Sequence, residues 1–152
     1  LVAAALAHAA RLALWRPRRS RTEPLVWALH VAYAWIPVHL ALRAAGALGA
    51  VPGSAATHAL AVGAIGGLVI AMITRTARGH TGRALRADRF DVACYALVLG
   101  AAALRVLVPL LAPALLVASV LASAALWSAG FALYALRYAP MLARARPDGR
   151  PG

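Results

Sequence analysis

The sequence contains no lysine, because all sixteen of its basic residues are arginine, and only four of its 152 residues are acidic. It also lacks any stretch polar enough to cover the surface of a soluble domain, since 63% of its residues are hydrophobic. The apolar residues come in runs of about 20, the length of helix that crosses a hydrocarbon core of ~30 Å. The composition therefore predicts a membrane protein that contacts the lipid bilayer.

The shortage of cysteine and of acidic residues excludes several kinds of chemistry. Cys94 is the sole cysteine, so no disulfide can form within the chain, and its apolar surroundings indicate a buried small residue. The acidic residues stand at predicted helix ends or in the tail: Glu23, Asp88, Asp91 and Asp148. We therefore expect neither a carboxylate proton relay within the membrane nor an acid partner for a nucleophilic serine.

The apolar runs predict an all-α, polytopic bundle. Lipid offers backbone groups no hydrogen-bond partner, and the runs show no strand-like alternation, so each run is expected to be helical. The predicted membrane domain, residues 1–142, contains a partial helix at 1–14 and four complete helices at about 24–45, 55–74, 92–111 and 114–138. A disordered tail is expected at 143–152. Because the chain begins within a hydrophobic run and without methionine, we expect a fragment of a larger protein.

The placement of the arginines predicts the orientation of the bundle. Only Arg43 and Arg105 lie near the helix ends joined by the uncharged connections "GALGAVPGS" and "PLLAP". The other arginines gather in the remaining loops and the tail, so these loops and the C-terminus are expected to be cytoplasmic. A net charge of +12 would favour nucleic acid in a soluble chain, but no groove-reading motif or interleaved aromatic residue accompanies it. We therefore expect no nucleic-acid partner.

Short motifs indicate helix starts and close packing. Asp88 and Asp91 precede the apolar run at 92–111, where acidic side chains can cap a helix and interact favourably with its dipole. Gly63 and Gly67 form a pair of small residues four positions apart, which lets a membrane helix approach a neighbour closely. We expect the helix at 55–74 to pack tightly through this face.

Five histidines are the remaining candidates for chemistry: His8, His30, His39, His58 and His80. Counting ~1.5 Å per residue from the cytoplasmic helix ends places the first two roughly 10 Å into the membrane, and His39 and His58 roughly 22 to 25 Å. His80 is expected near the inner surface. Imidazole is a common ligand of haem iron and copper, and the shortage of sulfur and carboxylate ligands favours these two centres. For each histidine, the alternative is a buried residue that only makes hydrogen bonds.

Spacing limits which histidines can share a centre. His30 and His39 are nine residues apart and therefore face opposite sides of one helix. His58 and His80 are 22 residues apart, or ~33 Å along an unbroken helix, which is too far for one ion. Arg105 is expected at the level of His58, where it either snorkels to the outer headgroups or pairs with the carboxylates of a haem.

Two segments, "RTEPLVWALHVAYAWIP" and "HALAVGAIGGLVIAMITRTARGHTGR", resemble the C-terminal half of the NnrS family of bacterial inner-membrane proteins. The likeness runs from about His8 to Arg105 and continues weakly after that. It implies a multi-pass protein of roughly twelve membrane helices, whose N-terminal helices are missing from this sequence. It also implies bound haem and copper and protection against nitric oxide and nitrosative stress, often in denitrification. No settled catalytic reaction comes with the family.

The resemblance also ranks the candidate ligands. It matches His8, His30, His58 and His80 as metal ligands, whereas His39 stands where the family pattern implies a small residue and so ranks lowest. His58 then takes its partner from the missing helices. The inner group, His8 and His30 with or without His80, is the candidate copper centre.

The leading expectation is a haem- and copper-containing inner-membrane protein that binds nitric oxide or handles iron-nitrosyl species. Its expected cofactor-binding residues are His58, His30 and Arg105. The alternative is a transporter or channel with a histidine-lined path and no cofactor, and a structural partner subunit is a third possibility. A visible spectrum separates the first two, because only a haem protein has a Soret band.

Overall fold

The computed structural model describes residues 1–147 and 149, and every regular element within them is helical. In chain order the elements are α1 (Val2–Leu14), η1 (Pro17–Ser20), α2 (Pro24–Ala47), α3 (Gly53–His58), η2 (Ala59–Gly66), α4 (Gly67–His80), α5 (Arg89–Leu111), η3 (Pro113–Leu115) and α6 (Leu116–Leu142). Four helical stretches of the described chain are long and apolar enough to cross a membrane: Pro24–Ala47, Gly53–His80, Arg89–Leu111 and Pro113–Leu142. The predicted all-α bundle with four complete membrane helices is therefore confirmed.

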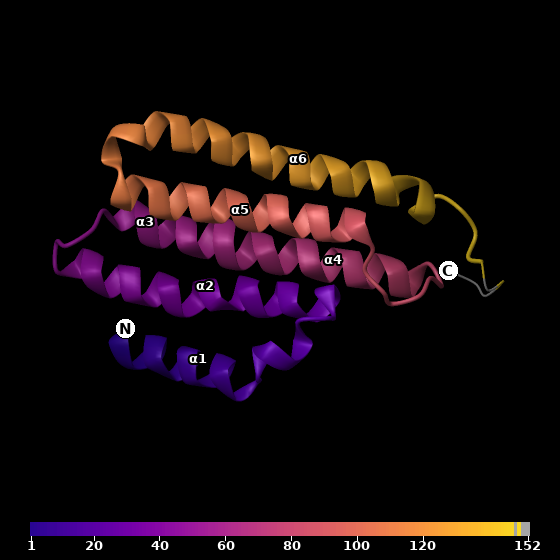
Figure 1. Ribbon diagram of the computed structural model, residues 1–152, viewed down its shortest axis with the longest axis horizontal. Helices are drawn as coiled ribbons and strands as arrows, with labels where there is room; N and C mark the ends of the chain where they lie inside the picture. Colours follow the sequence, from indigo (N-terminus) through magenta and orange to yellow (C-terminus); the bar gives the residue numbers. More distant parts are fainter. Residues whose placement is uncertain (148, 150–152) are drawn as a thin grey trace.

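The helices lie side by side in chain order, each antiparallel to the one before it (Figure 1). α1 packs on α2, and α6 packs on α5. Both α2 and α5 pack on the continuous helix that α3, η2 and α4 form. We call one end of the bundle the arginine-rich end, because it gathers the arginines of residues 16–21, 75–89 and 137–146. The loop after α2 and the turn between α5 and α6 form the opposite end.

The helices extend beyond the apolar runs that predicted them. The helix expected at 55–74 spans Gly53–His80, and the one expected at 114–138 ends at Leu142. A polar residue ends an apolar run without ending a helix, because it can bond within the helix itself. The Thr76 hydroxyl, for example, donates to the Met72 carbonyl at 2.8 Å.

The expected tail lies partly outside the described residues, which omit 148 and 150–152. In its described part, Arg146 donates from Nη1 to the carbonyl of His80 at 3.0 Å. This contact holds the chain after α6 against the end of α4.

Glycines let the third membrane helix approach its neighbours, as the sequence predicted. A Cβ atom on Gly63 would lie 2.9 Å from Cβ of Trp35 and would overlap the indole ring. On Gly67 it would lie 2.7 Å from Cβ of Ala32. Segment η2 is a π-helix, which no feature of the sequence had predicted, and π-helices often lie near functional sites. This segment begins directly after His58.

Candidate functional site

Two of the candidate histidines lie in an aromatic cluster between α1 and α2. Nδ1 of His8 and the hydroxyl of Tyr33 are 2.6 Å apart. The ring centroid of Trp15 lies 4.7 Å from that of Tyr33 and 6.1 Å from that of His30. Nδ1 of His30 lies 3.2 Å from the hydroxyl of Ser20. The fold therefore brings His8 and His30 into one cluster, with two aromatic rings between them.

His30 also lines a cavity of about 480 Å³ at the arginine-rich end. Its walls include Arg18 and Arg21 from the segment before α2, and Trp27 and Val31 from α2 itself. Neither arginine has an ion-pair or hydrogen-bond partner among the described residues. This cavity can therefore offer an imidazole nitrogen, two positive charges and apolar walls to a ligand.

His58 and Arg105 line one smaller cavity, of about 240 Å³, between the third membrane helix and helices α5 and α6. Val62, Ser123 and Trp127 are also in its walls. The expectation that Arg105 lies at the level of His58 is thus confirmed. Arg105 has no ion-pair or hydrogen-bond partner within the described part of the chain, so an anionic group could bind to it there.

The other two histidines lie apart from these cavities. His39 is buried on the side of α2 that faces α3, where its Nδ1 donates to the carbonyl of Ala56 at 2.7 Å. His80 is exposed at the end of α4, and the unbroken helix separates it from His58. Within residues 1–147 and 149, no three His, Cys, Asp or Glu side chains gather closely enough to hold a metal ion. The expected inner group of His8, His30 and His80 is therefore not assembled by these residues alone.

A family model described as NnrS protein matches residues 1–146. The chain belongs to the NnrS family. The match confirms the resemblance seen in the sequence and extends it from Arg105 through α6. No curated protein and no solved structure gave a match. Family membership suggests a role in the nitric oxide response, and together with four apolar helices it identifies this NnrS chain as a membrane protein.

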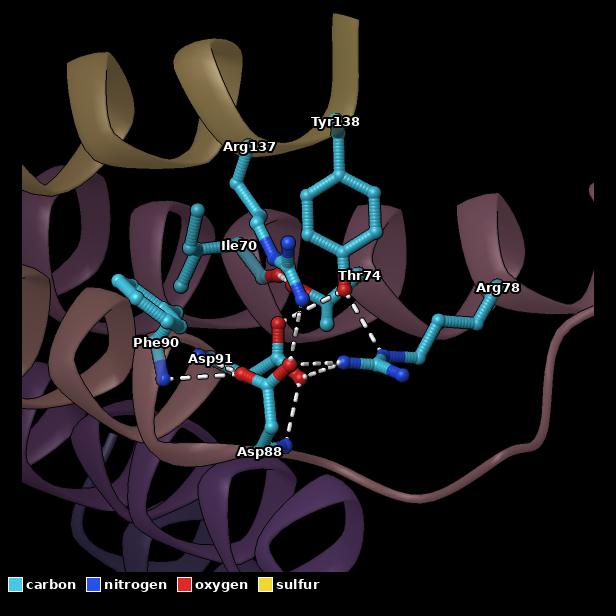
Figure 2. A network of polar contacts seen from close by, with 8 residues as sticks. All are labelled: Ile70, Thr74, Arg78, Asp88, Phe90, Asp91, Arg137 and Tyr138. Carbon is cyan, nitrogen blue, oxygen red and sulfur yellow. Dashed lines mark hydrogen bonds and ion pairs between the residues drawn. The ribbon is translucent and has the colours of Figure 1, made fainter. Parts of the chain in front are cut away.

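An ion-pair network at the arginine-rich end is the feature of this NnrS chain that sequence reasoning missed (Figure 2). Nη2 of Arg78 on α4 lies 2.5 Å from Oδ2 of Asp91 and 2.9 Å from Oδ2 of Asp88. The hydroxyl of Tyr138 accepts a hydrogen bond from Nε of Arg78 at 2.9 Å and donates one to Oδ1 of Asp91 at 2.7 Å. Nη2 of Arg137 lies 3.1 Å from Oδ2 of Asp88. The network joins α4, α5 and α6.

Asp88 and Asp91 also cap α5, as the sequence predicted. The carboxylate of Asp88 accepts from the backbone N–H groups of Phe90 and Asp91, and that of Asp91 accepts from the N–H of Asp88. The cap does not explain why the Asp91 side chain is only 1% exposed. A buried carboxylate needs a cation, and the nearby arginines were the signal that could have predicted the pair.

The surroundings of Asp88 lower the pKa of its carboxyl. Burial alone would raise this pKa, but the hydrogen bond from Arg137 and those from two backbone N–H groups outweigh burial, with help from the charge of Arg78. The network therefore holds an ionised carboxylate at the start of α5 and serves to fix three helices together.

Proposed function

We propose that this NnrS chain is part of a haem-containing bacterial inner-membrane protein that protects cells against nitric oxide by binding it. Family membership supports the link to nitric oxide. The bias of arginine toward one end supports a cytoplasmic C-terminus. The observation that carries the proposal is the cavity in which His30 lies beside Arg18 and Arg21, two arginines without an anionic partner among the described residues.

The residues around His30 fit a haem. The cavity volume of about 480 Å³ lies within the range of ~300–1,000 Å³ that small-molecule sites span. A metal-binding histidine usually holds its other ring nitrogen in a hydrogen bond, and Nδ1 of His30 has such a contact with Ser20. Nε2 of His30 would bind the iron, and Arg18 and Arg21 would bind the haem carboxylates.

Bound haem would supply an iron that takes a diatomic ligand. The residues around the cavity determine which kind of ligand reaches the iron. With Arg18 and Arg21 bound to the haem carboxylates, Trp27 and Val31 leave the rest of the cavity apolar, which favours an uncharged molecule such as nitric oxide over an ion. The cavity also lies in a membrane domain, and nitric oxide partitions into lipid.

His58 and Arg105 repeat the pairing of imidazole and guanidinium in a cavity of about 240 Å³, below the usual range for such ligands. We therefore place them second to His30 as haem-binding residues.

Copper fits the described residues less well, because they bring no three donor side chains together. His8 and His80 would need further donors to hold copper. We therefore assign no copper chemistry to this chain.

A visible spectrum of the full-length protein in detergent, with haem quantified chemically, tests the proposal. We expect a Soret band that shifts when nitric oxide is added, that is lost in His30→Ala, and that is kept in the control His80→Ala, whose side chain is exposed. Arg18→Gln with Arg21→Gln should lower haem content. A band lost only in His58→Ala would place the haem beside Arg105 instead. A colourless protein from haem-replete cells would contradict the proposal and favour the histidine-lined transporter.

A further inference from the structure

A separate cavity lies at the opposite end of the bundle, between the end of α2 and the start of α3. It has a volume of about 540 Å³, and His39, Arg43 and Thr57 are its lining residues with polar side chains. Gly46 and Gly53 leave part of its wall without side chains, and a Cβ atom on Gly53 would meet nothing within 4 Å. There is therefore room for a ligand beside the three polar side chains.

One contact defines the hydrogen-bonding state of His39, which lines this cavity. A carbonyl oxygen can only accept, so the 2.7 Å contact with Ala56 requires that Nδ1 of His39 carries the proton. In the neutral ring Nε2 is then an acceptor, and it has no partner among the described residues. The residue is 9% exposed, so this nitrogen belongs to a nearly buried and fixed side chain.

Arg43 adds a positive charge that no acid of the described chain balances. It follows His39 by four residues, which places both side chains on the same face of α2. The described acidic residues Glu23, Asp88 and Asp91 all lie at or near the starts of α2 and α5, which belong to the arginine-rich end. No ion pair or hydrogen bond of Arg43 is present within residues 1–147 and 149. The cavity is therefore suited to an anion.

We propose that His39, Arg43 and Thr57 form a binding site for an oxyanion that carries a hydroxyl group, with dihydrogen phosphate as the simplest example. The guanidinium of Arg43 binds two of its oxygens. The anion's hydroxyl donates to Nε2 of His39. The hydroxyl of Thr57 turns from its long, 3.5 Å contact with the carbonyl of Gly53 and donates to a further oxygen of the anion. A lipid phosphodiester has no hydroxyl on phosphorus, so it leaves Nε2 of neutral His39 unsatisfied.

Calorimetric titration of the full-length protein with inorganic phosphate at pH 7, in a phosphate-free detergent, tests this site. We expect one phosphate per chain, binding at least ~10-fold weaker in Arg43→Gln, as loss of a charge-assisted pair implies, and partly restored in Arg43→Lys. Thr57→Val should weaken it less. Arg144→Gln is the control, because that arginine is exposed beyond the end of α6.

Three results would overturn the proposal: no phosphate binding, equal binding in Arg43→Gln, or a phospholipid retained through Arg43 in native mass spectrometry without any binding of free phosphate. The last result would assign the cavity to a lipid headgroup. Arg43 is exposed, so its variants should keep the thermal stability of the parent, and measuring that stability separates lost binding from lost folding. Failure here would leave the His30 cavity and its proposed haem untouched.

Discussion

Arg78 and Asp91 form an ion pair, with 2.5 Å between Nη2 and Oδ2, that ties α4 to the first turn of α5. Their side chains are 9% and 1% exposed, so little water screens the pair. Tyr138 connects both residues to α6. Because α4 continues through η2 into α3, this pair also anchors the helix that carries His58 at its far end.

Asp91→Asn should destabilise the protein by ~1–3 kcal/mol, because it removes the closest charge from the buried guanidinium of Arg78 and leaves only the ion pair with Asp88 at 2.9 Å. Asp88→Asn is the matched control. Asp88 is one-third exposed, and asparagine still caps a helix, so this change should cost only ~1 kcal/mol or less. Denaturant unfolding of the full-length protein in detergent measures both. Equal losses of unfolding free energy in the two variants would show that the buried ion pair contributes no more to stability than the partly exposed one.

Acid should loosen the arginine-rich end. The pKa of Asp88 is lower in the folded protein than its ordinary value of 3.8, so the ionised form stabilises the fold. This stabilisation is complete above the ordinary pKa and disappears as the pH falls through the lower folded-state value. We expect thermal stability to drop below pH ~4 and the drop to be smaller in Asp88→Asn. An unchanged acid profile in that variant would show that Asp88 does not contribute.

Gly63→Ala should destabilise the bundle by ~1–3 kcal/mol, because the new methyl group would overlap the base of Trp35, which cannot swing aside. Gly79→Ala is the control on the same continuous helix. A Cβ atom on Gly79 meets only Leu85, at 3.8 Å, so this change should stabilise the helix by ~0.5–1 kcal/mol. Thermal unfolding of both variants measures these changes in stability. An unchanged stability in Gly63→Ala would contradict the close packing described above.

The orientation can be tested by cysteine labelling, because the sole native thiol, Cys94, is buried. In a Cys94→Ala background, Ser54→Cys lies at the opposite end and Arg144→Cys beyond the end of α6, and both positions are exposed. In intact cells, a membrane-impermeant maleimide should label the Ser54→Cys variant but not the Arg144→Cys variant. In lysed cells it should label both variants. The reverse pattern would place the arginine-rich end outside.

Much of the fold follows from elementary features of the sequence. Runs of about 20 apolar residues must be helical in lipid, because the backbone groups have no other partner there. The caps at Asp88 and Asp91 and the close approach at Gly63 also follow from residue type and spacing. The positions of the helix ends do not follow from the sequence in this way. Arg75 and Arg78 end the apolar run, but the helix continues to His80.

The candidate sites depended on how the helices pack. The sequence by itself determined an all-helical membrane bundle and a short set of histidines that could act. Helical spacing also showed that His30 and His39 face opposite sides. Only the tertiary structure decided which groups of different segments meet: Arg18 and Arg21 beside His30, Thr57 beside His39, and Arg78 beside Asp91. The hydrophobic period of one helix depends only on residues close together in the sequence, so the sequence predicts it. When a charged residue has its partner on another helix, side-chain packing across the bundle decides which residue that partner is.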